Sequence, residues 1–583
     1  MNKNARVFLW LGLVLLLWLN FETWNRDYAP PPAPPAPVAG TPSSTLSAAI
    51  PQTSAPASAV ADMPPTASVP ATPAPDLTAA PPALPPSASV VTGPEAAVTA
   101  TPATAGTVRV RTDVLDVDIN LAGGELSRAD LLVYPLVKGE DRPVRLLNRD
   151  GAGFYVMQSG LAGPAGATRP THLAMFESGV SDVVMPDLLD EVRVPLTWTD
   201  GGGVTVTKTY VFQRGSYRVG LEYKVDNRST VSWPAASYVQ ILRDDIPIER
   251  SMFDVESYAF KGPAFYDGNK YSKLKLDDDD DRNLARDIQG GWIAGMQHHF
   301  TTAVVPPRDA TYRYAMKVDG QQYLLSVAGP LREIAPDTQA TFGETLFVGP
   351  KLQAQLETTG PRLDLVADYG MLTLLAKPLF WLLEKAHDLV GNWGWAIVLI
   401  TALLKLVFYP LSEASGKSMA KMRVLAPRIK NLQDTYKDDR EKLGKAMMEM
   451  YQREKINPLA GCLPILIQMP VFFAFYWVLL ESVEMRQAPF MGWIQDLSAK
   501  DPFFVLPIVM AGAMFVQYKL NPAPPDPIQA KVFMILPIVM SVTFAFFPSG
   551  LVLYWVTNTI LSIAQQWNIN RRIEAAAAAG KRV

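Results

Sequence analysis

Apolar residues are concentrated in six runs, and this pattern predicts a polytopic membrane protein. The first run lies near the N-terminus. Five more follow after about residue 390, at Trp393–Leu411, Leu463–Leu480, Phe503–Tyr518, Val532–Phe547 and Leu551–Ile569. Runs of this length and apolarity are typical of membrane-spanning helices. We predict six spans, of which the last five form an α-helical membrane core over residues 392–570.

The N-terminal run, Val7–Leu19, follows Lys3 and Arg6. A cleaved signal peptide would show small residues just after its apolar core. Bulky residues follow here instead, including Phe21 and Trp24. We therefore predict an uncleaved membrane anchor over residues 1–27, with a cleaved signal peptide as the alternative.

Residues 28–106 differ sharply in composition from the rest of the chain. They hold 20 of the 50 prolines and contain no lysine or arginine. A segment rich in Pro, Ala, Ser and Thr buries too little apolar surface to offset the entropy of ordering. We predict a disordered linker.

Residues 107–360 show the period-two alternation of half-buried β-strands. It is clearest in VTVTKTYVF (Val204–Phe212) and YRVGLEYKVDN (Tyr217–Asn227). Strands punctuated by Asp-Gly and Gly-Gly pairs favour an all-β sandwich.

Residues 361–391 alternate apolar turns with charges, which predicts an amphipathic helix at the membrane surface.

Basic residues orient the spans. Residues 412–461 carry 11 Lys/Arg against 7 Asp/Glu, and the tail at 571–583 is also basic. Short basic segments stay in the cytoplasm. We predict cytoplasmic termini and a large periplasmic β-domain in a bacterial inner membrane.

The 412–461 segment is predicted to be a cytoplasmic helical hairpin. Four methionines recur there at helical spacing: Met419, Met422, Met447 and Met450. Flexible thioether side chains suit an adaptable binding face for a hydrophobic client, but they also pack helices together. Both interpretations stay open.

Composition excludes several other functions. The net charge is −3, which argues against nucleic-acid binding, and the single cysteine, Cys462, excludes an intrachain disulfide. The run Asp277–Asp281 lacks the ligand spacing of a calcium loop, so we predict a solvated loop. His298 and His299 have no partner visible in sequence. We predict neither a metal, a cofactor nor an enzyme.

Lys405 is the most informative residue, because it lies inside the apolar run ITALLKLVFYPL (Ile400–Leu411). A charge within a span is unfavourable by roughly 2.5–3.5 kcal/mol, so it faces protein or water, or snorkels to the membrane surface. Counted from the run ends, Lys405 lies about 9 Å from the cytoplasmic side at ~1.5 Å per residue.

Polar residues on neighbouring runs lie at similar predicted depth. They are Thr401 one turn away, Gln468 on the second run, and Asn558, Ser562 and Gln565 on one face of the last run. Such stripes face one another, because each is unfavourable in lipid. The sequence therefore predicts a wet, positively charged groove that opens to the cytoplasm and stops part-way across.

Several motifs make the chain resemble the YidC membrane protein insertase family of Gram-negative bacteria. The matching stretches are TDVLDVDIN (Thr112–Asn120), GGW (Gly290–Trp292), VGNWGWAIVLIT (Val390–Thr401), YPL (Tyr409–Leu411), SMAKMR (Ser418–Arg423), INPLAGCLPILIQMP (Ile456–Pro470), VEMRQAPF (Val483–Phe490) and FPSGLVLYW (Phe547–Trp555). The resemblance implies a five-helix core with a hydrophilic groove, a periplasmic β-supersandwich and a functional cytoplasmic hairpin. The family's groove charge is commonly an arginine, and Lys405 keeps the charge without the forked geometry.

The same resemblance implies the clients and partners. Nascent inner-membrane proteins would insert into the lipid bilayer, alone or with the Sec translocon, past spans bearing Met469, Pro470, Phe472 and Ser541. The basic hairpin and tail would contact the ribosome or the signal-recognition targeting machinery.

Two other functions would use the same features. A small-anion transporter would use Lys405 as its binding site, although the paired broken helices common in transporters are not visible. A periplasmic binding receptor would use the β-sandwich as its sensor, so deletion of residues 107–360 would abolish its function, whereas an insertase would retain most of it.

Overall fold

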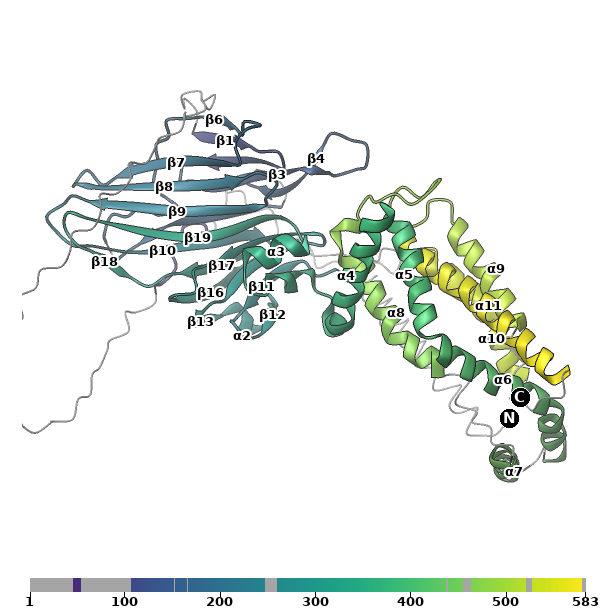
Figure 1. Cartoon of the computed structure of the whole chain (residues 1–583). Coiled ribbons are helices and arrows are strands. Elements are labelled where there is room, and N and C mark those ends of the chain that lie inside the picture. Colours follow the sequence, from purple (N-terminus) through teal and green to yellow (C-terminus); the bar gives the residue numbers. More distant parts are fainter. Residues whose placement is uncertain are drawn as a thin grey trace, which may run out of the picture.

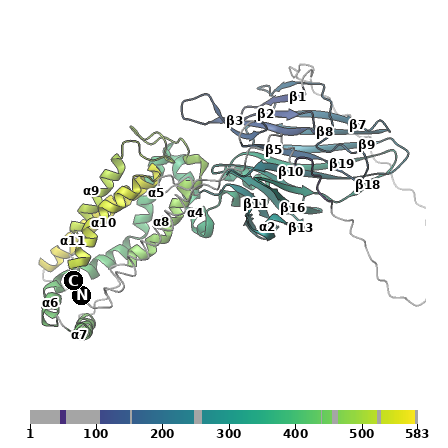
Figure 2. The same cartoon turned by 180° about the vertical axis from the view of Figure 1, so that it is seen from behind.

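The computed structural model describes residues 46–53, 106–150, 153–164, 166–246, 259–436, 439–453, 463–520 and 527–578. A β-rich part and a helical part lie side by side, and both views show the helices extending away from the sheets (Figures 1 and 2). The predicted anchor at 1–27 and most of the predicted linker lie outside the described residues.

Two antiparallel-dominated sheets form the β-rich part. The 11-stranded sheet has the order β13-β16-β17-β10-β5-β4-β3-β2-β1-β6, and β18 also pairs with β10. Its strands are β1 (Thr107–Arg111), β2 (Leu115–Asn120), β3 (Glu125–Pro135), β4 (Pro143–Asn148), β5 (Tyr155–Ala162), β6 (Asp182–Val184), β10 (Trp233–Asp244), β13 (Ala285–Gln289), β16 (Thr311–Asp319), β17 (Gln322–Ala328) and β18 (Arg332–Ile334).

The 8-stranded sheet has the order β12-β11-β14-β15-β19-β9-β8-β7. Its strands are β7 (Glu191–Thr199), β8 (Val204–Gln213), β9 (Arg218–Asn227), β11 (Gly262–Tyr266), β12 (Tyr271–Lys273), β14 (Trp292–Met296), β15 (Phe300–Val305) and β19 (Thr338–Pro350). Apolar side chains from both sheets share one core cluster. The predicted β-rich domain is therefore confirmed.

Alternation along the strands explains this core. In β8, Val204, Val206 and Tyr210 are buried, whereas Thr205, Thr207 and Thr209 are part-exposed. Lys208 occupies one of the inward positions and is fully buried. Its Nζ donates to the carbonyl oxygens of Gly123 and Ser159, both at 3.1 Å. Burial lowers the pKa of Lys208 well below its usual value.

The helical part follows β19. Its helices, with one short helix in the β-rich part, are α2 (Asp279–Arg282), α3 (Gln353–Thr359), α4 (Thr373–Val390), α5 (Trp393–Val407), α6 (Tyr409–Thr435), α7 (Arg440–Arg453), α8 (Leu463–Glu481), α9 (Val505–Leu520), α10 (Pro527–Phe544) and α11 (Ser549–Ala578). α4 packs against α5 and α8, and α11 packs against α5 and α9. A second apolar cluster joins α4, α5, α8 and α11.

The run Trp393–Leu411 is not one straight helix. α5 ends at Val407, and the chain bends by 57° before α6 begins at Tyr409. Pro410 explains the break, because proline restricts the preceding residue and fits the first turn of a new helix. No described helix is alone long and apolar enough to cross a membrane, but Trp393–Val407 and Tyr409–Lys417 together are.

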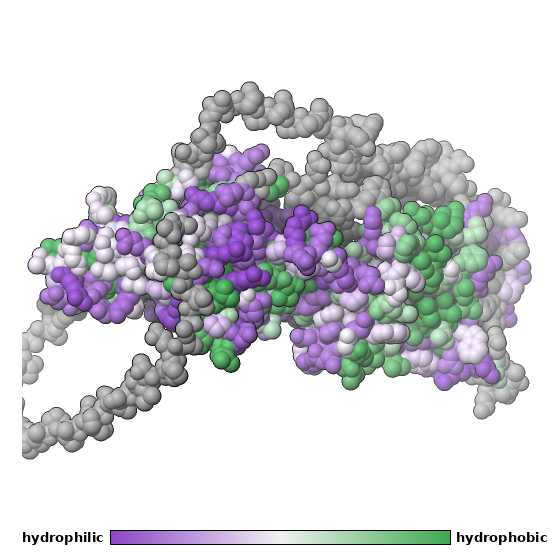
Figure 3. All heavy atoms as spheres, turned by 90° about the horizontal axis from the view of Figure 1, so that it is seen from above, coloured by the Kyte–Doolittle hydropathy of each residue, from purple (hydrophilic) through white to green (hydrophobic). Residues whose placement is uncertain are grey.

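Exposed apolar side chains gather on the helical part. Figure 3 shows a broad hydrophobic surface there, whereas the visible β-rich surface is mostly hydrophilic. α10 exposes apolar side chains over much of its surface, including Ile538 and Val542, and α9 exposes Ile508. One face of α10, with Ser541 and Phe544, is buried. A broad exposed apolar surface suits a lipid environment.

Two further predictions need correction. Residues 46–53 of the predicted disordered linker contact the 11-stranded sheet: Leu46 is buried among Val156, Leu242 and Leu324. The predicted loop at Asp277–Asp281 contains the helical turn α2, which Asp278 caps by accepting a hydrogen bond from the Asp280 N–H.

Candidate functional site

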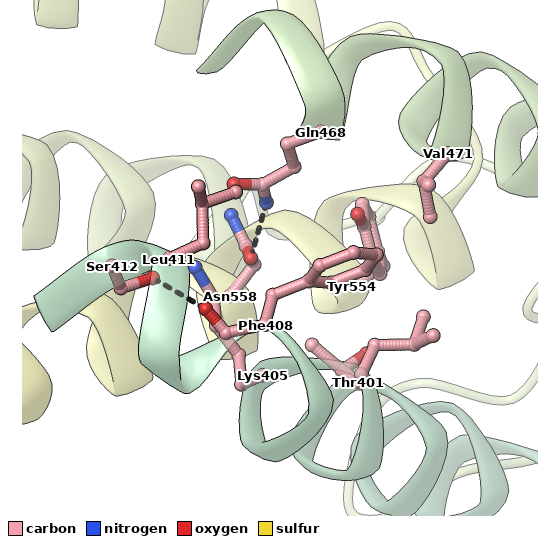
Figure 4. A pocket seen from close by; sticks show the side chains of 10 residues that line it. Thr401, Lys405, Phe408, Leu411, Ser412, Gln468, Val471, Tyr554 and Asn558 are labelled. Carbon is pink, nitrogen blue, oxygen red and sulfur yellow. Dashed lines mark hydrogen bonds between the residues drawn. The ribbon is translucent and has the colours of Figure 1, made fainter. Parts of the chain in front are cut away.

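A small cavity lies where α5, α6, α8 and α11 meet (Figure 4). Its volume is about 30 Å³, roughly the space of one water molecule. It is lined by Thr401, Leu404, Lys405, Phe408, Leu411, Ser412, Gln468, Val471, Tyr554 and Asn558. Residues from four helices therefore meet at the predicted groove, which is narrow in this structure.

Lys405 contacts the last helix. Its Nζ donates to the Ser562 Oγ at 2.8 Å, and its own carbonyl oxygen accepts from the Gln565 Nε2 at 3.1 Å. The Ser562 hydroxyl donates in turn to the Asn558 carbonyl oxygen at 2.7 Å. In the part of the chain that the structure describes, no carboxylate forms an ion pair with Lys405. The ammonium is therefore held by neutral groups.

Gln468 and Asn558 form a second polar bridge across the cavity. The Gln468 Nε2 donates to the Asn558 Oδ1, as Figure 4 shows. This bridge joins α8 to α11 and lies beside Tyr554, whose ring stacks on Phe475 with centroids 4.7 Å apart. The structure thus brings together Lys405, Gln468 and the polar residues of α11.

Thr401 and Ser412 line the cavity, but their hydroxyls bond within their own segments. The Thr401 Oγ1 donates to the Ile397 carbonyl oxygen at 2.6 Å, and the Ser412 Oγ donates to the Phe408 carbonyl oxygen at 3.2 Å. The predicted depth of Lys405 assumed a straight run to Leu411, and the chain is bent within that run. The bend at Phe408 lies only three residues after Lys405.

Four apolar lining residues were not predicted from the sequence: Leu404, Phe408, Leu411 and Val471. The first three follow the same spacing of three and four residues as Thr401 and Ser412. Their position on this helix face could therefore have been predicted from the sequence. Attention to polar residues alone missed them. These apolar walls lower the local polarity around Lys405.

The residues predicted to border the client path differ in exposure. Met469 and Pro470 are exposed on α8, and Phe472 is half-buried. Ser541 on α10 is buried rather than exposed, and its hydroxyl has no hydrogen-bond partner among the described residues.

The structure describes the side chains of two of the four hairpin methionines. Met447 and Met450 on α7 pack against Leu425 and Ile429 on α6, which form a small apolar cluster of their own. The side chains of Met419 and Met422 lie outside the described part. The packing role predicted for the methionines is thus visible for two of the four.

The two parts of the molecule meet at a buried junction that the sequence did not indicate. The His298 Nε2 donates to the Leu480 carbonyl oxygen at 2.9 Å, near the C-terminal end of α8. The adjacent Glu481 Oε2 lies 3.7 Å from the Lys351 Nζ, and both side chains are at most 3% exposed. Burial lowers the pKa of His298 to about 3 and that of His299 well below its usual value.

The β3–β4 hairpin fastens the same junction. The Arg486 Nη2 donates to the Pro135 carbonyl oxygen at 2.8 Å, and the Lys138 Nζ donates to the Gln487 carbonyl oxygen at 2.9 Å. These contacts hold the segment between α8 and α9 against the β-rich part.

A β-rich domain joined to helices with a broad exposed apolar surface defines a membrane protein with a large polar domain. Comparison with known proteins agrees. The family model described as 60Kd inner membrane protein matches residues 385–576, and the YidC periplasmic domain model matches residues 107–382.

Two curated relatives, both named membrane protein insertase YidC, match nearly the whole chain. That of Thioalkalivibrio sulfidiphilus is 46% identical, covering 99% of this chain and 100% of the relative. That of Nitrosococcus oceani is 44% identical, covering 98% and 99%. The chain belongs to the YidC family of membrane protein insertases. It is a bacterial inner-membrane protein with a periplasmic domain, and it is not an enzyme.

A solved structure also matches, described as an active YidC insertase with the first transmembrane domain resolved. It is 19% identical, covers 80% of this chain and 93% of its own, and has a TM-score of 0.35.

Proposed function

We propose that the groove around Lys405 receives the polar or acidic segment of an inserting client from the cytoplasm. The observation that carries this proposal is the neutral surroundings of the ammonium. Lys405 has three N–H donors, and Ser562 accepts one of them. Among the described residues no other hydrogen bond from the ammonium is seen, so its remaining donors and its charge are available to a carboxylate of the client.

The polar bridge between Gln468 and Asn558 supports a second role for the groove. Amide groups that bond to one another can exchange that bond for water or for a client's backbone. Each unsatisfied polar group is unfavourable in lipid by several kcal/mol, so substitutes for water lower the barrier to its passage. The apolar part of the client then partitions into lipid past α8 and α10, where Met469 and Pro470 are exposed.

The proposed topology has six spans and two cytoplasmic termini. Residues 1–27 form the anchor, residues 28–106 the periplasmic linker apart from its docked piece, residues 107–360 the β-domain and residues 361–391 the interfacial helix. The core covers residues 392–570, and the tail covers residues 571–583. The basic charge of the hairpin and tail supports their cytoplasmic location. There they would contact the ribosome or the targeting machinery, and the Sec translocon would be a partner within the membrane.

Insertion of a single-span client with an acidic N-terminal tail tests the groove proposal. Proteoliposomes would contain the unaltered chain, Lys405→Arg, Lys405→Ala or Lys405→Glu. We expect Arg to retain insertion, because it keeps the charge, and Ala and Glu to lose most of it. A client with Asn in place of the tail's acidic residues should insert nearly equally with the unaltered chain and with the Lys405→Ala variant.

Lys519→Ala is the matched control, because Lys519 lies at the exposed end of α9 and its removal changes net charge equally. If Lys405→Ala inserts acidic tails as well as the unaltered chain does, Lys405 is a snorkelling residue and the proposal fails.

A further inference from the structure

Residues 46–53 are placed against the β-domain, although the sequence around them is rich in proline and alanine. They read Leu-Ser-Ala-Ala-Ile-Pro-Gln-Thr and begin with a turn in which the Ala49 N–H donates to the Leu46 carbonyl oxygen at 3.1 Å. Leu46 is 5% exposed, whereas Ile50 is 43% exposed. Of the two large apolar side chains, only that of Leu46 is buried against the β-domain.

The pocket for Leu46 is formed by three strands in register. Leu242 on β10 is paired with Val156 on β5 and with Leu324 on β17. All three are nearly fully buried and form a cluster separate from the main core, on the outer face of the 11-stranded sheet. A leucine side chain that fills such a pocket is removed from water, which stabilises the docked segment.

Polar groups at the edge of the pocket bind the backbone of the segment. The His172 Nε2 donates to the Ser47 carbonyl oxygen at 2.9 Å, and its Nδ1 accepts from the Tyr238 hydroxyl at 2.6 Å. The Gln240 Nε2 donates to the Ala49 carbonyl oxygen at 3.3 Å.

Both side chains that bind the segment, those of His172 and Gln240, are buried. Gln240 is fully buried, and its Nε2 also donates to the Gln158 Oε1 at 2.8 Å, whereas its own Oε1 has no partner in the described part of the chain. Buried side chains aimed at the carbonyl oxygens of a passing segment are typical of a peptide-binding site rather than of incidental contact.

We propose that the outer face of β5, β10 and β17 is a peptide-binding site for a leucine-anchored turn with small following residues, and that its ligand is the chain's own residues 46–53. The pocket selects a leucine side chain, and His172 and Gln240 donate hydrogen bonds to the backbone carbonyl oxygens of the bound segment. The site acts as a tether within the linker.

Tethering shortens the connection to the N-terminal apolar run. From Leu19 to Leu46 the chain has 26 intervening residues, against 87 between Leu19 and Thr107. At about 3.5 Å per residue the maximal reach falls from about 300 Å to about 90 Å. This consequence rests on the anchor proposed above, but the docking itself does not.

Distance measurement between two spin labels tests the site. Labels at Ala48→Cys and Gln321→Cys, both exposed positions, would be introduced into the full chain in nanodiscs with Cys462→Ser. We expect a narrow distance distribution. Leu46→Asp should broaden it, and the matched control Ile50→Asp should leave it narrow, because Ile50 is not buried in the pocket.

Competition in solution distinguishes a binding site from simple crowding. A peptide of residues 44–55 at about 10 mM, above the millimolar effective concentration of a tethered segment, should broaden the distribution. The same peptide with Asp in place of its leucine should not. A narrow distribution that survives Leu46→Asp, or a peptide that displaces nothing, would overturn the proposal. The measurement is independent of client insertion.

Discussion

The Lys405 Nζ lies 2.8 Å from the Ser562 Oγ, and this contact joins α5 to α11. Because the Ser562 hydroxyl already donates to the Asn558 carbonyl oxygen, it acts only as an acceptor for the ammonium. The charge of Lys405 is thus positioned by the fold without being neutralised.

Ser562→Asp should remove this free charge without touching Lys405. A carboxylate at this position would pair with the ammonium and compete with a client's acidic tail. We expect insertion of acidic-tailed clients into proteoliposomes to fall at least tenfold, roughly 1.4 kcal/mol in barrier. The control Ser562→Asn, which matches Asp in shape but lacks its charge, should keep most of the activity. Equal activity of the Asp and Asn variants would contradict a role for the free charge.

The Lys351–Glu481 pair predicts strong coupling at the junction. Lys351→Met leaves the buried Glu481 carboxylate unpaired, so we expect a loss of about 3–5 kcal/mol in the free energy of unfolding. Lys351→Met with Glu481→Leu should recover most of that loss. Denaturant titration of the detergent-solubilised chain measures both.

Lys385→Met is the control for that cycle. Lys385 pairs with Asp388 at 2.9 Å, but both side chains are more than half exposed. We expect little or no change in the free energy of unfolding, because exposed ion pairs contribute little to stability. A similar loss at both sites would show that burial does not decide the effect.

Acid should weaken the junction through its two histidines. The pKa of His298 is lowered to about 3 and that of His299 well below normal, whereas an unfolded histidine titrates near 6.5. Below pH 6.5 the unfolded chain therefore binds protons that the folded chain does not, and the free energy of unfolding falls. At pH 5 the loss through His298 is about 2 kcal/mol relative to pH 8, and His299 adds a loss in the same direction.

Buried carboxyl groups act in the opposite direction. Burial raises the pKa of Glu344 and of Glu484 to about 7, so their protonation stabilises the folded chain as the pH falls. The informative quantity is therefore the difference in free energy of unfolding between the unaltered chain and His298→Gln/His299→Gln. We expect the unaltered chain to lose at least about 2 kcal/mol against this variant between pH 8 and pH 5. A pH-independent difference would refute neutral, buried imidazoles.

Gly394 fixes the approach of α5 to the segment after α8. A Cβ at this position would lie 2.1 Å from the Phe490 Cδ2. We expect Gly394→Ala to lower the free energy of unfolding by about 1–3 kcal/mol, and Phe490→Ala to relieve the clash when the two are combined.

Gly512→Ala is the corresponding control on α9, because no atom lies within 4 Å of its ideal Cβ. It should be neutral or slightly stabilising, by up to about 1 kcal/mol, since alanine favours helix. Thermal unfolding of the two variants in the same detergent gives the comparison.

Much of the groove could be predicted from the sequence, because its signals are local. An isolated lysine in an apolar run and polar residues at spacings of three and four are readable from one helix at a time. The sequence did not predict that Lys405 contacts Ser562 or that Gln468 contacts Asn558. Those pairs depend on the rotation of each helix about its axis, which non-local packing decides.

Other features depended entirely on non-local contacts. Composition predicts disorder for residues 46–53, yet a pocket on strands more than 100 residues away holds Leu46. His298 has no partner in sequence because its acceptor, the Leu480 carbonyl oxygen, lies 182 residues later.

The sequence by itself determined the β-rich domain, the apolar runs, the basic segments and the unusual charge of Lys405. Each follows from periodicity or composition over a short window, where burial and propensity act locally. The tertiary structure alone decided the docking of Leu46 and the buried pair of Lys351 and Glu481. In these cases the partner that satisfies a side chain comes from a distant element, and only the folded chain brings the two together.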